Sequence, residues 1–84
     1  MREAADFYDL ERPGLGTEFL DVVERTMHRV IEHPESYPIA LEPVRKCVLS
    51  RFPYSVIYSV RDGEVYVSAV AHHSRRPFYW RDRI

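Results

Sequence analysis

The chain has 84 residues, of which 45% are hydrophobic and 30% are charged. This length predicts one domain, residues 1–84, that buries about two-thirds of its unfolded surface, and the composition argues against disorder. No apolar run approaches the ~20 residues of a membrane span, and the opening residues do not resemble a signal peptide. The single cysteine, Cys47, favours a reducing cytoplasm and is predicted to be a small buried hydrophobic residue.

The net charge of −1 conceals two halves of opposite sign. Residues 1–42 contain four arginines and ten acidic residues, a net charge of −6, whereas residues 43–84 contain eight Lys/Arg and three Asp/Glu, a net charge of +5. This asymmetry predicts a basic surface that faces an acidic partner or nucleic acid. The alternative is that both charged faces only solvate the fold.

Two helices are predicted in the first half of the chain. Residues 2–11 have helical composition, and Pro13, Gly14 and Gly16 then interrupt the pattern. A second helix is predicted from Thr17, with Pro13 or Leu15 as an earlier start, to the residue before Pro34. Its apolar stripe predicts the face that packs on the core: Phe19, Leu20, Val23, Met27, Val30 and Ile31. The two helices predict an αα-hairpin.

The second half predicts strands. Residues 33–43 contain three prolines and are expected to form a loop, and strands are expected at 44–51, 54–61 and 65–72. Asp62-Gly63 is typical of a hairpin turn. In the last strand, strict alternation places Val65, Val67, Ala69 and Ala71 on one face. The predicted fold class is α+β, an αα-hairpin packed on a three-stranded antiparallel β-meander.

Basic, imidazole and aromatic side chains gather after the last strand: His72, His73, Arg75, Arg76, Tyr79, Trp80, Arg81 and Arg83. They could bind phosphate and cleave a phosphodiester, with His73 or Tyr79 in proton transfer. They could also form a protein-binding hot spot or a nucleic-acid surface. The structural alternative is that Tyr79 and Trp80 cover the core while the arginines face water. No metal-type spacing or phosphate-binding loop occurs, so no metal or cofactor is expected.

Three motifs resemble the ParE/RelE superfamily of type II toxin–antitoxin (plasmid stabilisation) toxins. They are F-P-Y-x-V-I-Y from Phe52, x-V-x-V-x-A-V-x-H ending at His72, and R-x-P-x-Y-W-x-x-R through Arg83. The segments P-G-L-G-T-E-F and I-E-H-P resemble the helical hairpin of the same family. The resemblance implies a cytoplasmic, growth-inhibiting toxin that a cognate antitoxin neutralises.

Family members normally open with a further strand, whereas this sequence begins inside the first helix. The resemblance therefore implies a sheet without its first strand, and an exposed edge that a second copy or the antitoxin can fill.

Two activities separate within the superfamily. RelE-like members cleave ribosome-bound mRNA and tend to carry Arg at the position of Ser55, whereas ParE-like members bind DNA gyrase and are not nucleases. Ser55 and the P-x-Y-W ending favour a ParE-like, non-enzymatic toxin, with target or phosphate contacts predicted at Arg45, Arg51, His72, Arg75, Arg76, Trp80 and Arg83. The alternatives are a ribosome-dependent endonuclease, with His73 and Tyr79 as catalytic residues, and an inactive member that only binds antitoxin or dimerises.

Overall fold

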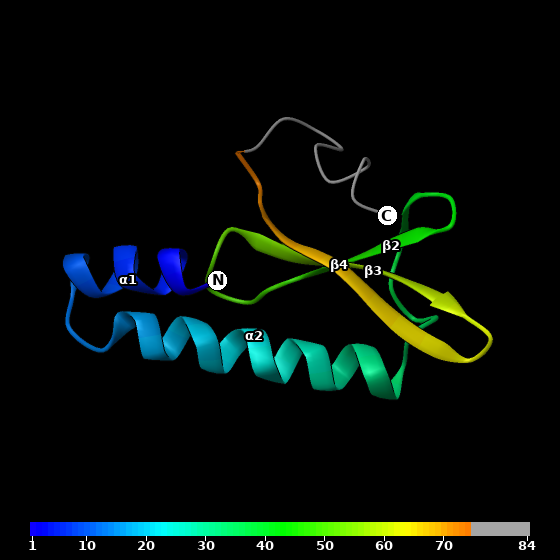
Figure 1. Ribbon diagram of the computed structural model, residues 1–84, viewed down its shortest axis with the longest axis horizontal. Coiled ribbons are helices and arrows are strands. Elements are labelled where there is room, and N and C mark those ends of the chain that lie inside the picture. Colours follow the sequence, from blue (N-terminus) through cyan, green and yellow to red (C-terminus); the bar gives the residue numbers. More distant parts are fainter. Residues whose placement is uncertain (75–84) are drawn as a thin grey trace.

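The computed structural model describes residues 1–74, which form two helices followed by a four-stranded antiparallel sheet (Figure 1). The helices are α1 (Arg2–Glu11) and α2 (Leu15–Glu32), and the strands are β1 (Ile39–Leu41), β2 (Val44–Val48), β3 (Tyr54–Arg61) and β4 (Glu64–His72). The strands lie side by side in chain order, so the sheet is a meander. The predicted α+β architecture is confirmed, with one strand more than expected.

The additional strand, β1, comes from the segment that we expected to be a loop. Ile39 pairs with Arg45 and Leu41 pairs with Val44 at the edge of the sheet. Pro38 and Pro43 flank the strand and are not part of it, and an edge position tolerates such neighbours. The prolines led us to predict a loop, and the prediction therefore missed the three-residue strand between Pro38 and Pro43.

The two helices meet closely at the start of α2, which begins at Leu15, the later of the two earlier starts considered. A Cβ atom on Gly16 would lie 2.3 Å from the Ala5 carbonyl oxygen, so only glycine permits this approach. The Gly16 N–H donates to the Asp9 carboxylate at 2.8 Å. This bond satisfies one of the N–H groups that the first turn of a helix leaves without a backbone partner.

The main hydrophobic core lies between α2 and one face of the sheet. From α2 it takes Phe19, Val22, Val23, Thr26 and Val30, and from the sheet it takes Cys47, Val56 and Tyr58. Cys47 is thus buried as predicted. Ile31, expected in the core, is 65% exposed, and Leu20 and Met27 are only half-buried.

The inward face of α2 is therefore rotated from the predicted stripe toward Val22 and Thr26. Thr26 tolerates burial because its hydroxyl donates to the Val22 carbonyl at 2.7 Å.

A bulge changes which residues of β4 face the helices. Ile57 of β3 pairs with Ala69, but the next residue, Tyr58, pairs with Val67, so Ser68 is an extra residue in β4. Val65 and Val70 consequently both pack on the helix-side core. The strict alternation that we predicted is wrong beyond Val67, because one added residue exchanges the two faces of a strand.

The opposite face of the sheet holds a smaller cluster. Val44, Ile57 and Ala71 are buried there, with Ala40, Leu41 and Ala69 packed around them. Neither described helix packs on this face, because the helix residues of the core all belong to the other cluster. In Figure 1, α2 runs along the sheet and α1 lies beyond the end of the sheet. We call this side of the sheet, on which neither described helix packs, the open face.

Replacement of Val56 by Ala tests the position of the main core. Val56 is fully buried, so we expect Val56→Ala to lower the free energy of unfolding by about 2 kcal/mol in urea denaturation. Val48→Ala is the matched control, because Val48 lies on the neighbouring strand and is 53% exposed. It should cost less than about 0.5 kcal/mol, and similar costs for both variants would contradict the assignment of faces.

Candidate functional site

Three of the sequence-predicted site residues lie at one end of the sheet. His72 is the last residue of β4 and pairs with the first residue of β3, and His73 follows it. Arg51 lies in the turn between β2 and β3. Five more predicted residues lie outside the described part of the chain: Arg75, Arg76, Tyr79, Trp80 and Arg83. The described residues therefore place the start of the predicted cluster but not its remainder.

An aromatic cluster forms the foundation of this end of the sheet. The centroid of the Tyr8 ring on α1 lies 5.2 Å from that of Phe19, 5.1 Å from that of Phe52 and 6.5 Å from that of Tyr54. The rings of Tyr54 and His72 are in turn nearly perpendicular, with their centroids 4.8 Å apart. Burial raises the pKa of Tyr8, and nearby Tyr54 and Glu11 add to the effect, so Tyr8 is a neutral packing residue at physiological pH.

The two histidines leave the strand on opposite sides. His72 faces the helices, where its Nδ1 accepts hydrogen bonds from the Ser74 backbone N–H at 2.9 Å and from the Ser74 hydroxyl. The His73 Nε2 instead lies 2.9 Å from the hydroxyl of buried Ser55, which faces the open side of the sheet. A backbone bond from the His73 N–H to the Pro53 carbonyl, also at 2.9 Å, fixes the end of β4 against the β2–β3 turn.

Arg51 is tied to the helical hairpin. Its guanidinium lies 2.8 Å from a carboxylate oxygen of Glu18 on α2, and the other oxygen of Glu18 accepts from Arg12 at 3.1 Å. The hydrogen bond from Arg51, followed by the charge of Arg12, holds the pKa of Glu18 below its usual range. Arg51 also has a φ of 69°, a left-handed conformation that the tight β2–β3 turn imposes.

Arg45 lies away from this group. It pairs with Tyr58, four residues along β3 from the partner of His72, which corresponds to roughly 13 Å. Its guanidinium donates to the Tyr37 carbonyl at 2.7 Å and, more weakly, to the Glu35 carbonyl at 3.4 Å. Arg45 therefore anchors the loop between α2 and β1, and the Tyr58 hydroxyl helps by donating to the Pro34 carbonyl at 2.5 Å.

These contacts define what the described site can do chemically. Arg45, Arg51 and His73 do not converge on one point, and each is engaged in a structural bond. Within residues 1–74 no group of three His, Cys, Asp or Glu side chains could hold a metal ion. Neither of the described helices is long and apolar enough to cross a membrane. Within residues 1–74, separate structural contacts therefore hold the side chains of Arg45, Arg51 and His73 apart.

Sequence reasoning missed Glu18, on which two arginines converge from different parts of the chain. It was identified only as part of the start of the second helix. A local signal existed for Arg12, six residues away, but the contact with Arg51 spans 33 residues and depends on the fold.

One comparison with known proteins gives a match. The family model described as "ParE toxin of type II toxin-antitoxin system, parDE" matches residues 1–77, which include both helices and all four strands. Searches of curated proteins and of solved structures gave no match.

Replacement of Glu18 by Gln tests the tie between the helical hairpin and the β2–β3 turn. Because the pKa of Glu18 is lowered in the fold, its stabilising effect is present above the usual value of 4.5 and is lost as the pH falls below it. We expect Glu18→Gln to be less stable than the wild type at pH 7, with a difference that closes toward pH 3. Urea denaturation across this range measures the difference.

Glu24→Gln is the matched control, because Glu24 is an exposed carboxylate of the same helix that makes no ion pair within residues 1–74. Its effect on the free energy of unfolding at pH 7 should be smaller than that of Glu18→Gln. A Glu18→Gln difference that is constant from pH 7 to pH 3 would show that the ion pairs do not stabilise the fold.

Proposed function

Because the chain belongs to the ParE toxin family of type II toxin–antitoxin systems, we propose that it inhibits growth by binding DNA gyrase. A cognate antitoxin is the partner that the family implies. Both encounters would take place in the cytoplasm. The proposal describes a toxin that acts by binding and carries out no chemistry of its own.

The observation that supports binding over catalysis is the separation of Arg45, Arg51 and His73, the described residues that a nuclease site would use. A phosphodiester-cleaving site needs cations and a proton donor within reach of one phosphate. Here Arg45 holds a loop, Arg51 holds Glu18, and His73 contacts the buried Ser55 hydroxyl. Ser55 also occupies the strand position where mRNA-cleaving relatives tend to carry Arg.

The open face of the sheet supplies the features of a protein-binding surface. A hollow on this face is lined by Pro43, Val44, Ser59, Arg61, Tyr66, Val67 and Ser68. The Arg61 guanidinium lies 4.2 Å above the Tyr66 ring, an arrangement that holds two side chains typical of binding hot spots in place. We propose that gyrase contacts this face together with His72, Arg75, Arg76, Trp80 and Arg83.

For the antitoxin we propose an acidic or amphipathic segment that lies across the basic sheet face and the helical hairpin. The +5 charge of residues 43–84 is the motive for an acidic segment. Its affinity should fall as salt rises, since exposed charge pairs are screened. If the protein forms a homodimer, we propose that the second copy pairs with the edge of β4.

A supercoiling assay tests the proposed target. Purified gyrase should lose supercoiling activity on addition of micromolar protein, and preincubation with the antitoxin should restore it. Induction of the chain without antitoxin should arrest bacterial growth. Unchanged supercoiling in the presence of protein that arrests growth would contradict gyrase as the target.

The variant His73→Ala separates this proposal from mRNA cleavage. If the protein acts by binding gyrase, growth arrest should persist in His73→Ala, because His73 has no proton to transfer in that mechanism. The alternative, a ribosome-dependent endonuclease with His73 and Tyr79 as catalytic residues, requires mRNA cut in the ribosomal A site and loss of cutting in the variant. Full viability on strong induction would instead favour a member that only binds its antitoxin or dimerises.

A further inference from the structure

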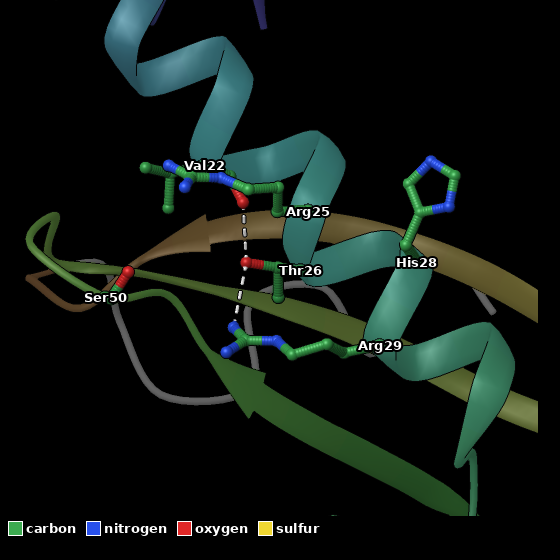
Figure 2. A pocket seen from close by; sticks show the side chains of 6 residues that line it. All are labelled: Val22, Arg25, Thr26, His28, Arg29 and Ser50. Carbon is green, nitrogen blue, oxygen red and sulfur yellow. Dashed lines mark hydrogen bonds between the residues drawn. The ribbon is translucent and has the colours of Figure 1, made fainter.

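A second hollow lies between α2 and the β2–β3 turn, on the helical side of the molecule. It has a volume of about 330 Å³ and is lined by Val22, Arg25, Thr26, His28, Arg29 and Ser50. We call these residues the α2 pocket. Figure 2 shows the Arg29 side chain reaching back along the helix to the Thr26 hydroxyl, while the His28 ring points away from the other side chains. The residues proposed to contact gyrase do not include any that line this pocket.

Two arginines of the α2 pocket form no ion pair within residues 1–74. Arg25 and Arg29 are four residues apart on one helix, a spacing at which like charges repel. Within residues 1–74 neither guanidinium has a carboxylate oxygen within 4.0 Å. Asp21 and Glu32 stand four and three residues away along α2, within reach for helical ion pairs, yet they form none.

This lack of pairing is selective. Residues 1–42 contain ten carboxylates and four arginines, and the other two arginines are both paired, Arg2 with Asp6 and Arg12 with Glu18. The two arginines without an ion pair, Arg25 and Arg29, both line the α2 pocket. An incoming anion would relieve their mutual repulsion.

The pocket is rich in hydrogen-bond donors that have no partner within residues 1–74. A guanidinium carries five N–H groups, but Arg29 uses only one, toward the Thr26 hydroxyl at 3.4 Å, and Arg25 has no hydrogen bond within the described chain. The Thr26 hydroxyl donates its hydrogen bond to the Val22 carbonyl at 2.7 Å. The Ser50 side chain also has no hydrogen bond to another described residue. Such a donor-rich site matches an oxyanion.

We propose that the α2 pocket is a carboxylate-binding site that receives one Asp or Glu side chain of the antitoxin. The inference rests on the proposed function only in naming the antitoxin as the partner. Guanidinium groups bind carboxylates through paired N–H bonds, and the Val22 side chain offers an apolar wall to the methylenes of the incoming residue.

The surroundings favour a single carboxylate over a nucleic acid. Glu18, Asp21 and Glu24 lie on the same helix, and a polyanion with one charge every ~1.7 Å would meet them. One carboxylate avoids that repulsion if its neighbours on the partner are neutral or basic. The antitoxin segment over α2 should therefore carry an isolated acidic residue flanked by uncharged or basic ones.

Titration with small anions tests the pocket itself. We expect sodium acetate, at constant ionic strength, to shift the Nε–H resonances of Arg25 and Arg29 in NMR spectra, with saturation. The Arg2 resonance should not move, because Arg2 is already paired with Asp6 on the exposed face of α1. In Arg29→Gln the saturable shift of Arg25 should be lost. Shifts of Arg25 and Arg29 no larger than that of Arg2 would overturn the site.

Binding of the antitoxin tests the partner. We expect Arg25→Gln and Arg29→Gln each to raise the Kd about 10-fold or more in calorimetric titration. Arg29→Lys, which keeps the charge but loses the fork of donors, should recover only part of the affinity. Arg2→Gln makes the same charge change on an exposed residue and should alter the Kd less than about fivefold.

The outcomes separate the two proposals. Equal effects of Arg2→Gln and the pocket variants would overturn the carboxylate contact, even if gyrase is the target. Antitoxin affinity that depends on Arg25 and Arg29, with no effect of the protein on supercoiling, would support the contact and overturn only the target. Arg25 makes no hydrogen bond or ion pair within the described chain, so Arg25→Gln should melt like the wild type and keep the test valid should Arg29→Gln fail to fold.

Discussion

Packing among the rings of Tyr8, Phe19, Phe52 and Tyr54 joins the helical layer to the sheet. Phe19 alone lies 5.2 Å from Phe52 and 5.0 Å from Tyr54, so α2, the β2–β3 turn and β3 meet at one ring. Tyr8 brings α1 into the same cluster. Edge-to-face and tilted contacts of this kind add to the free energy of burial. The position of Arg51, His72 and His73 relative to the helices depends on this cluster.

Much of the fold could be predicted because its signals are local. The apolar spacing of α2 and the sequence Asp62-Gly63, where both residues adopt positive φ, are readable within a few residues. The strand β1 and the bulge at Ser68 have no such local signal. The strand β1 forms because it pairs with β2, and the bulge forms because β4 pairs with β3. Each therefore depends on a neighbouring strand and not on its own residues alone.

The candidate site was less predictable than the fold for a related reason. Residue type identified Arg45, Arg51, His72 and His73, but not which of them would be occupied by structural bonds. Arg45 binds backbone carbonyls, which carry no mark in a sequence. The spacing of four residues between Arg25 and Arg29 is visible in the sequence, but it does not show whether either side chain has an ion-pair partner. Only the structure shows that the ten carboxylates of the same half leave these two arginines unpaired.

The bulge in β4 makes the length of this strand matter more than the identity of its extra residue. Ser68 divides β4 into a part next to the hairpin turn and a part that ends at His72. The alternation of side chains between the two faces of the sheet is shifted by one residue between these parts. Replacing Ser68 would leave both parts in register. Deleting it would direct one of the two parts to the wrong face, exchanging Val70 for alanines against the helices. During divergence of this family, substitutions should therefore accumulate at this site while insertions and deletions are eliminated.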